Sequence, residues 1–86
     1  MTFENAWKIM EAASAENVEI HWFTRTEEHG SYDSKTRWNC RIEELPFFVS
    51  LFEVNQVDVT DYSASLFILL EPEQTAQYWE RIKRLA

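Results

Sequence analysis

The chain is poor in the residues that build tight turns, disulfides and basic surfaces. Its 86 residues include one glycine, two prolines, one cysteine, two histidines and eight lysines and arginines. The single cysteine, Cys40, excludes a disulfide within the chain, so no oxidising compartment is indicated. The scarcity of glycine and proline argues against a disordered chain. One glycine also cannot form the glycine-rich loop that binds phosphate groups.

Long apolar runs are missing as well. The longest, residues 66–70, is far shorter than the roughly 20 residues of a membrane-spanning helix. No basic segment followed by an apolar one opens the chain, so we expect no signal peptide and a cytoplasmic protein. Aromatic rings are plentiful, with 4 Trp, 3 Tyr and 6 Phe. These rings offset the small buried fraction available to a short chain, and residues 1–86 are predicted to form a single compact domain.

The region around the only glycine, Gly30, organises the predicted fold. Apolar and polar residues alternate along residues 18–25 and again along residues 36–42. Alternation of this kind is typical of strands with one buried face. The two strands are predicted to pair as a hairpin with apolar residues opposite one another. The predicted register sets three pairs on the outer face: Glu19 with Arg41, His21 with Asn39, and Phe23 with Arg37.

Helical periodicity predicts a helix over residues 3–15, capped by Thr2, and another over residues 73–85. Asn17 is predicted to end the first helix. Residues 46–54 are compatible with a helix or a strand. A short buried helix is favoured, because a proline at position 46 removes a hydrogen-bond donor from a strand.

Two further strand segments complete the order of elements. Residues 55–63 are predicted as a short edge strand or a loop, and residues 65–70 as a strand in the interior of the sheet. The order is therefore α-β-β-α-(β)-β-α. It predicts an α+β fold, with an antiparallel sheet of three or four strands and helices packed on one face.

No pattern typical of catalysis or metal binding occurs. The sequence has neither a paired-cysteine nor a His-x-x-x-His spacing. Cys40 falls on the predicted core face, where a thiol behaves as a small apolar group. Carboxylates are paired at 27–28 and 43–44, but acid–base catalysis needs a cleft, for which this chain has little room. We therefore expect no enzyme, no metal site and no cofactor.

Acidity is the main functional signal. Fifteen acidic and eight basic residues give a net charge of −7. An acidic surface repels phosphate backbones and anionic membranes, so we expect neither direct nucleic-acid binding nor membrane binding. It suits a basic protein partner instead. The candidate partner-binding residues lie in the hairpin connection, after its second strand and in the polar segment beyond: Glu27, Glu28, Tyr32, Asp33, Glu43, Glu44, Glu53, Asp58 and Asp61.

A small acidic protein can occupy the basic groove in which its partner holds nucleic acid, with aromatic side chains as anchors. The candidate anchors are Phe23, Tyr32, Phe47 and Tyr62. The leading hypothesis is an inhibitor that blocks the nucleic-acid-binding surface of a basic enzyme or complex, similar in kind to DNA mimics and phage counter-defence proteins. One alternative is an immunity protein or antitoxin that neutralises a cognate toxin. Another is a structural homo-oligomeric accessory protein. Carboxylates that are merely solvated and scattered are the plainest alternative.

Overall fold

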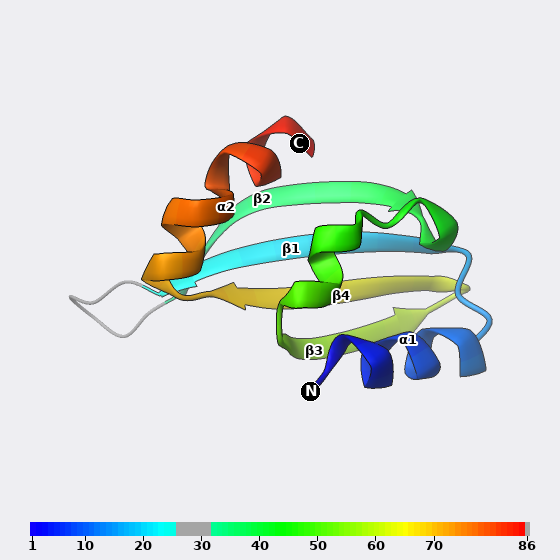
Figure 1. The fold of residues 1–86 in the computed structure, drawn as a ribbon. Helices are drawn as coiled ribbons and strands as arrows, with labels where there is room; N and C mark the ends of the chain where they lie inside the picture. The colour runs from blue at the N-terminus through cyan, green and yellow to red at the C-terminus, as the bar shows by residue number, and fades with distance from the viewer. Residues whose placement is uncertain (26–31, 86) are drawn as a thin grey trace.

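A computed structural model describes residues 1–25 and 32–85 of the chain (Figure 1). The elements follow in the order α1 (Phe3–Ala12), β1 (Asn17–Arg25), β2 (Tyr32–Arg41), η1 (Ile42–Glu44), η2 (Phe47–Leu51), β3 (Val54–Thr60), β4 (Ser63–Leu70) and α2 (Pro72–Leu85). η1 and η2 are short 3₁₀ helices. The four strands form one sheet in the order β2-β1-β4-β3. The predicted α+β class is confirmed, and the optional strand exists.

The sheet is mixed, so the prediction of a purely antiparallel sheet is wrong. β1 pairs antiparallel with β2, and β4 pairs antiparallel with β3. The two central strands, β1 and β4, run parallel. The β3–β4 hairpin joins the second edge of β1 through β4. Alternation along a strand identifies its buried face but carries no information on the direction of its neighbour.

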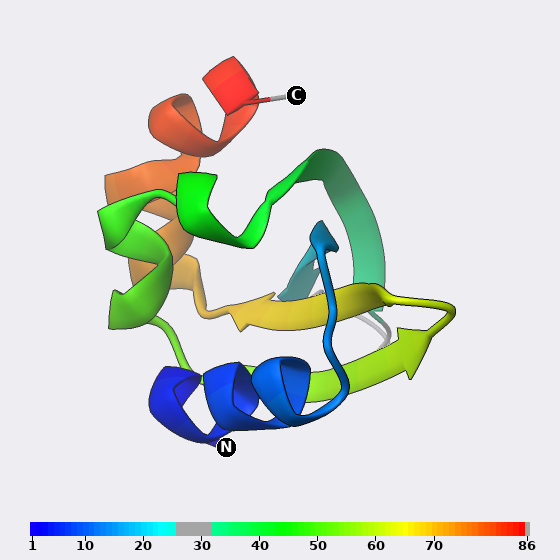
Figure 2. The ribbon, with the colours of Figure 1, turned by 90° about the vertical axis from the view of Figure 1, so that its right-hand side faces the viewer.

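The helical elements cover one face of the sheet (Figure 2). This core face carries side chains that are fully or almost fully buried, among them Val18, Ile20, Trp22, Ala64, Leu66 and Ile68. Ala6 and Met10 of α1, Val49 of η2 and Ile82 of α2 pack against them. Within the described part of the chain, no helix lies on the opposite face, which we call the open face. Its central side chains are Glu19, His21, Phe23, Ser65, Phe67 and Leu69.

The predicted hairpin register is wrong by two residues. Glu19 lies opposite Asn39 and His21 opposite Arg37, and after an irregularity Phe23 lies opposite Ser34. The cause is Ile42, which the prediction placed in the second strand. The strand ends at Arg41, and Ile42 reaches the core from η1, where it is 7% exposed. Cys40 thereby takes the place opposite Val18 that was predicted for Ile42.

The ends of the helices differ from the predicted ones in two places. α1 ends at Ala12, before the predicted 15, and Ser14 adopts a positive φ of 55°. Asn17, predicted to stop this helix, is the first residue of β1. The helix expected within 46–54 is the single 3₁₀ segment η2, which follows Pro46. Thr2 caps α1 as predicted, since its Oγ1 accepts a hydrogen bond from the Asn5 amide at 3.2 Å.

Candidate functional site

Most of the described acidic candidates lie at the two ends of the sheet. Glu43 and Glu44 form part of η1 and are exposed, at the end where β2 stops. Asp61 lies in the β3–β4 turn, at that same end, because Ser63 pairs with Asn17 at the start of β1. Glu53 comes just before β3, at the opposite end, and its carboxylate lies 3.8 Å from the N-terminal ammonium.

The remaining candidates follow the course of β2 and β3. Tyr32 pairs with Arg25, and Asp33 with Thr24, so both share the end of the sheet that carries Glu53. Glu27 and Glu28 lie outside the described residues. Asp58 is exposed in the middle of β3. The described carboxylates among the candidates are thus spread over two ends and the open face, and they do not gather in one patch.

A cluster of three rings occupies the centre of the open face. In the parallel pairing of β1 with β4, His21 lies opposite Phe67 and Phe23 opposite Leu69. The Phe67 ring centroid lies 4.7 Å from that of His21 and 5.8 Å from that of Phe23, and the interplanar angles are 15° and 24°. The three rings therefore form a nearly parallel layer. They are half-buried by one another, without any cover from a described helix.

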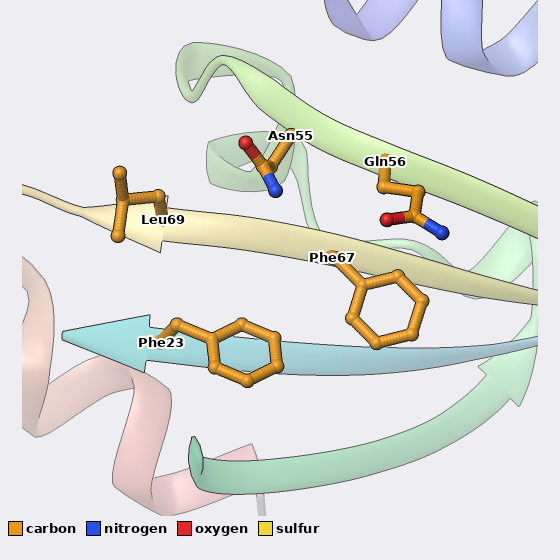
Figure 3. A pocket seen from close by; sticks show the side chains of 5 residues that line it. All are labelled: Phe23, Asn55, Gln56, Phe67 and Leu69. Atoms are coloured by element: carbon orange, nitrogen blue, oxygen red, sulfur yellow. The ribbon is translucent and has the colours of Figure 1, made fainter. Parts of the chain in front are cut away.

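Beside these rings lies a pocket of about 330 Å³, lined by Phe23, Asn55, Gln56, Phe67 and Leu69 (Figure 3). We call it the open-face pocket. It owes its polar side to an irregularity in β3, where Val54 pairs with Ile68 and Gln56 with Phe67. Asn55 is therefore an extra residue in the strand, as in a β-bulge. The bulge brings two consecutive amide side chains to the same pocket, which regular alternation would place on opposite faces.

Hydrogen bonds orient the polar groups around the pocket. Gln56 Nε2 donates to both carboxylate oxygens of Asp58, at 2.8 and 3.0 Å. Only the NH₂ group of an amide can donate to a carboxylate, so this contact fixes which way the Gln56 amide points. Its carbonyl oxygen is directed towards the Asn55 side of the pocket (Figure 3). His21 Nε2 lies 2.8 Å from Glu19 Oε1, within hydrogen-bonding distance.

Glu19 and Asp58 lie in one row across the open face. Ser65 of β4 pairs with Glu19 on one side and with Asp58 on the other. The next row along the strands contains His21, Phe67 and Gln56. The two carboxylates therefore lie on one side of the aromatic layer, one row away from it, which is about 6–7 Å along a strand. On the other side of His21, β2 places Arg37 opposite the histidine, so the row of the aromatic layer also contains a basic residue.

Of the pocket residues, only Phe23 was among the predicted anchors. The other four were missed: Asn55, Gln56, Phe67 and Leu69. One signal was available, because residues 66–70 are apolar at every position. The pattern was assigned to a strand inside the sheet, which is correct, but such a strand has two apolar faces and the helices cover only one.

Two other predicted anchors are well exposed. The side chain of Phe47 on η2 is 84% exposed, and that of Tyr62 in the β3–β4 turn is 66% exposed. Tyr62 also has a positive φ of 65°, and its neighbour Asp61 has one of 46°. Positive φ at both central residues is the geometry of a type I′ hairpin turn, in which Asn and Gly are favoured. A tyrosine with this φ is strained, and at 66% exposed it is not part of the core.

The Cys40 thiol and the grouping of possible metal ligands bear on catalysis and metal binding. Burial, and secondly the negative charge of Glu44, raises the pKa of the Cys40 thiol to about 11, so this buried thiol is a poor nucleophile. Within residues 1–25 and 32–85, no three His, Cys, Asp or Glu side chains are grouped to hold a metal ion. None of the described helices is long and apolar enough to span a membrane.

No model of a protein family, no curated protein and no solved structure matches this chain. Its function is therefore inferred from its own residues.

Proposed function

We propose that the chain is a small acidic inhibitor, not an enzyme, that acts in the cytoplasm by blocking the nucleic-acid-binding surface of a basic partner protein. The observation that carries this proposal is the open face. It combines an uncovered aromatic layer and pocket with two flanking carboxylates, Glu19 and Asp58. The net charge of −7 supports a basic partner.

The aromatic layer has the composition of an interface core. Interfaces concentrate aromatic residues at their centre and place polar groups at the rim. Here the rings of His21, Phe23 and Phe67 occupy the centre, and Glu19 and Asp58 lie in the adjoining row. Rings in that position supply binding energy when a partner covers them. Carboxylates in the adjoining row accelerate encounter with a basic surface and disfavour acidic partners.

The carboxylates at the ends of the sheet extend the acidic surface beyond the open face. Glu43, Glu44 and Asp61 lie at one end, and Glu53 lies at the other. Charges at this distance from the aromatic layer act mainly on the rate of association. Of the eight basic residues, Arg81, Lys83 and Arg84 lie on α2 and Lys8 lies on α1. The other four lie in the hairpin strands: Arg25 in β1, and Lys35, Arg37 and Arg41 in β2.

The test begins with affinity capture from the native host. A captured partner should be released at about 0.5 M salt, where the Debye length is only a few Å. The purified partner should then lose nucleic-acid binding when the chain is added. A partner that still binds nucleic acid equally well in the complex would contradict the proposal, as would direct binding of nucleic acid by the chain itself.

A matched pair of variants separates the open face from general acidity. Replacing Glu19 and Asp58 by Gln and Asn removes two charges from the open face. Replacing Glu73 and Glu80 by Gln removes the same charge from α2, where both side chains are exposed. Because close charge pairs contribute more than remote ones, the first variant should weaken partner binding about tenfold or more. The second should change it little.

A homo-oligomeric accessory protein is the second candidate. It is favoured by Phe47 and Leu51, which lie at the two ends of η2 and are 84% and 55% exposed. Exposed large apolar side chains of this kind are found at subunit contacts. Light scattering over a concentration series would detect such an assembly, and a Phe47→Ser variant should dissociate it. A mass that stays monomeric at all concentrations would exclude this candidate.

A further inference from the structure

We infer that the open-face pocket binds the guanidinium group of an arginine side chain presented by the basic partner. The inference rests on the proposed function, because it names the group by which that partner is held. It is carried by three features of the pocket: its flat aromatic side, its amide rim and the carboxylates in the adjoining row.

The aromatic side matches a planar cation. Phe23 and Phe67 lie side by side on neighbouring strands, with ring planes 24° from parallel (Figure 3). A guanidinium group stacks on such rings by combined cation–π and planar contact. Leu69 lines the same pocket and can pack against the methylene stem of an arginine. A volume of about 330 Å³ is at the lower end for ligand sites, which suits a single side chain.

The amide rim supplies acceptors. Arginine carries five N–H donors and no acceptor. The NH₂ group of Gln56 is already engaged by Asp58, so the carbonyl oxygen is the part of this amide that remains to accept a hydrogen bond. The adjacent Asn55 side chain lines the same pocket and carries a further amide, with one acceptor oxygen and one NH₂ group. The Gln56–Asp58 contact therefore leaves the Gln56 carbonyl oxygen oriented to accept hydrogen bonds from the N–H groups of an arginine.

The two carboxylates favour a guanidinium group over a nucleobase as the planar occupant of the pocket. A nucleobase would also stack on Phe23 and Phe67, but its phosphate would approach Glu19 and Asp58 on a chain of net charge −7. A guanidinium group gains from the same charges. A lysine ammonium would gain from the charge alone, because it has neither the plane to stack nor the fork of donors.

The proposed test compares two peptides of equal charge. Hexa-arginine and hexa-lysine are titrated into the ¹⁵N-labelled chain at the same salt concentration, and amide shifts are followed. We expect hexa-arginine to bind roughly three- to tenfold more tightly, the range of a partly desolvated cation–π contact. Its largest shifts should fall at Phe23, Asn55, Gln56 and Phe67. Adenosine and uridine monophosphates are titrated in parallel and should leave these residues unshifted.

A ring-removing variant tests the aromatic contribution. Replacing Phe23 and Phe67 by Leu keeps the apolar volume and removes both rings, so the fold is retained better than with Ala. This variant should bind the two peptides equally. The matched control is Phe47→Leu, which removes a ring from η2 on the helix-covered side and should keep the preference for arginine.

The outcomes separate the inference from the proposed function. Equal, salt-sensitive affinity of the native chain for both peptides would overturn the arginine pocket and leave the acidic inhibitor standing. A preference for arginine that survives in the Leu variant would also overturn the pocket alone. Shifts at the pocket caused by the nucleotides would overturn both, since the chain would then bind nucleic-acid components itself. Failure of both peptides to bind would likewise overturn both.

Discussion

Both faces of the central strands carry apolar side chains, but described helical elements cover only the core face. On β4, Leu66 and Ile68 point to the core face and are 0% exposed. Phe67 and Leu69 alternate with them, point to the open face and are half-buried without a helix over them. The same apolar run thus stabilises the fold with one set of residues and leaves the other set available. Apolar side chains on an uncovered face are what a partner would cover.

The sharpest comparison uses two leucines of the same strand. Replacing Leu66 by Ala should lower the free energy of unfolding by about 2–5 kcal/mol, because a cavity forms in the core. Replacing Leu69 by Ala should lower it by only about 1 kcal/mol, since part of that side chain already contacts water. Urea denaturation of both variants measures the difference. Equal losses would mean that the open face is as structural as the core face.

The reactivity of thiols on the two faces provides a second comparison. The pKa of Cys40 rises from 9.0 to about 11, so its thiolate at pH 8 is roughly 100-fold scarcer than in an unfolded chain. Alkylation of the native chain by iodoacetamide should be slower by a similar factor than in urea. A Ser65→Cys, Cys40→Ser variant carries its thiol on the open face between Glu19 and Asp58. It should react faster than Cys40 but more slowly than the unfolded chain, because the two carboxylates disfavour the thiolate.

The raised pKa of Cys40 also predicts a dependence of stability on pH. The folded chain keeps the thiol proton to about pH 11, whereas the unfolded chain loses it near pH 9.0. The free energy of unfolding should therefore fall as the pH rises from 9 to 11. The Cys40→Ser variant should lack this component of the fall, and an identical pH profile for the two proteins would contradict the burial of the thiol.

The strained turn between β3 and β4 gives a smaller effect with the opposite sign. Replacing Tyr62 by Gly should stabilise the chain by about 1 kcal/mol, because glycine adopts the positive φ without steric cost. Thermal unfolding measures the gain. If the same variant binds the partner less well, the tyrosine is present for recognition. A loss of stability would show that the ring contributes to the fold.

The smallest expected effect on stability comes from the carboxylate row. Asp58→Asn leaves an exposed side chain of the same shape in β3 and should change the free energy of unfolding by less than about 0.5 kcal/mol. It should nevertheless weaken binding of hexa-arginine, because it removes a charge next to the pocket. A variant that unfolds readily would indicate that the Gln56–Asp58 contact holds the bulge together.

Much of the fold could be predicted because alternation reports directly on burial. Val18, Ile20 and Trp22 were assigned to the core from their spacing and are at most 1% exposed. The register could not be predicted, since Ile42 fits a strand pattern equally well whether it belongs to the strand or to the 3₁₀ turn after it. The parallel direction of β4 relative to β1 could not be predicted either, because the alternation of apolar and polar residues in a strand does not depend on the direction of its neighbour.

The candidate site was less accessible to sequence reasoning. Phe23 was predicted as an anchor and lines the open-face pocket. Asn55 and Gln56 gave no signal, because a bulge in β3 is what brings both amides to one face. The distribution of acidic residues predicted a site in the hairpin connection instead. Two of the carboxylates predicted there, Glu27 and Glu28, fall outside the described residues.

The parallel pairing of β1 with β4 has a consequence for the order of folding. Each hairpin, β1–β2 and β3–β4, joins strands that are near in sequence, whereas the central ladder joins Val18 with Ala64. Contacts of long sequence separation form late, because closing the intervening loop costs entropy. Phe23 belongs to the first hairpin and Phe67 to the second. The open-face pocket therefore forms only when the two hairpins pair through β1 and β4. The rate at which ligand binding is recovered during refolding would measure when this pairing occurs.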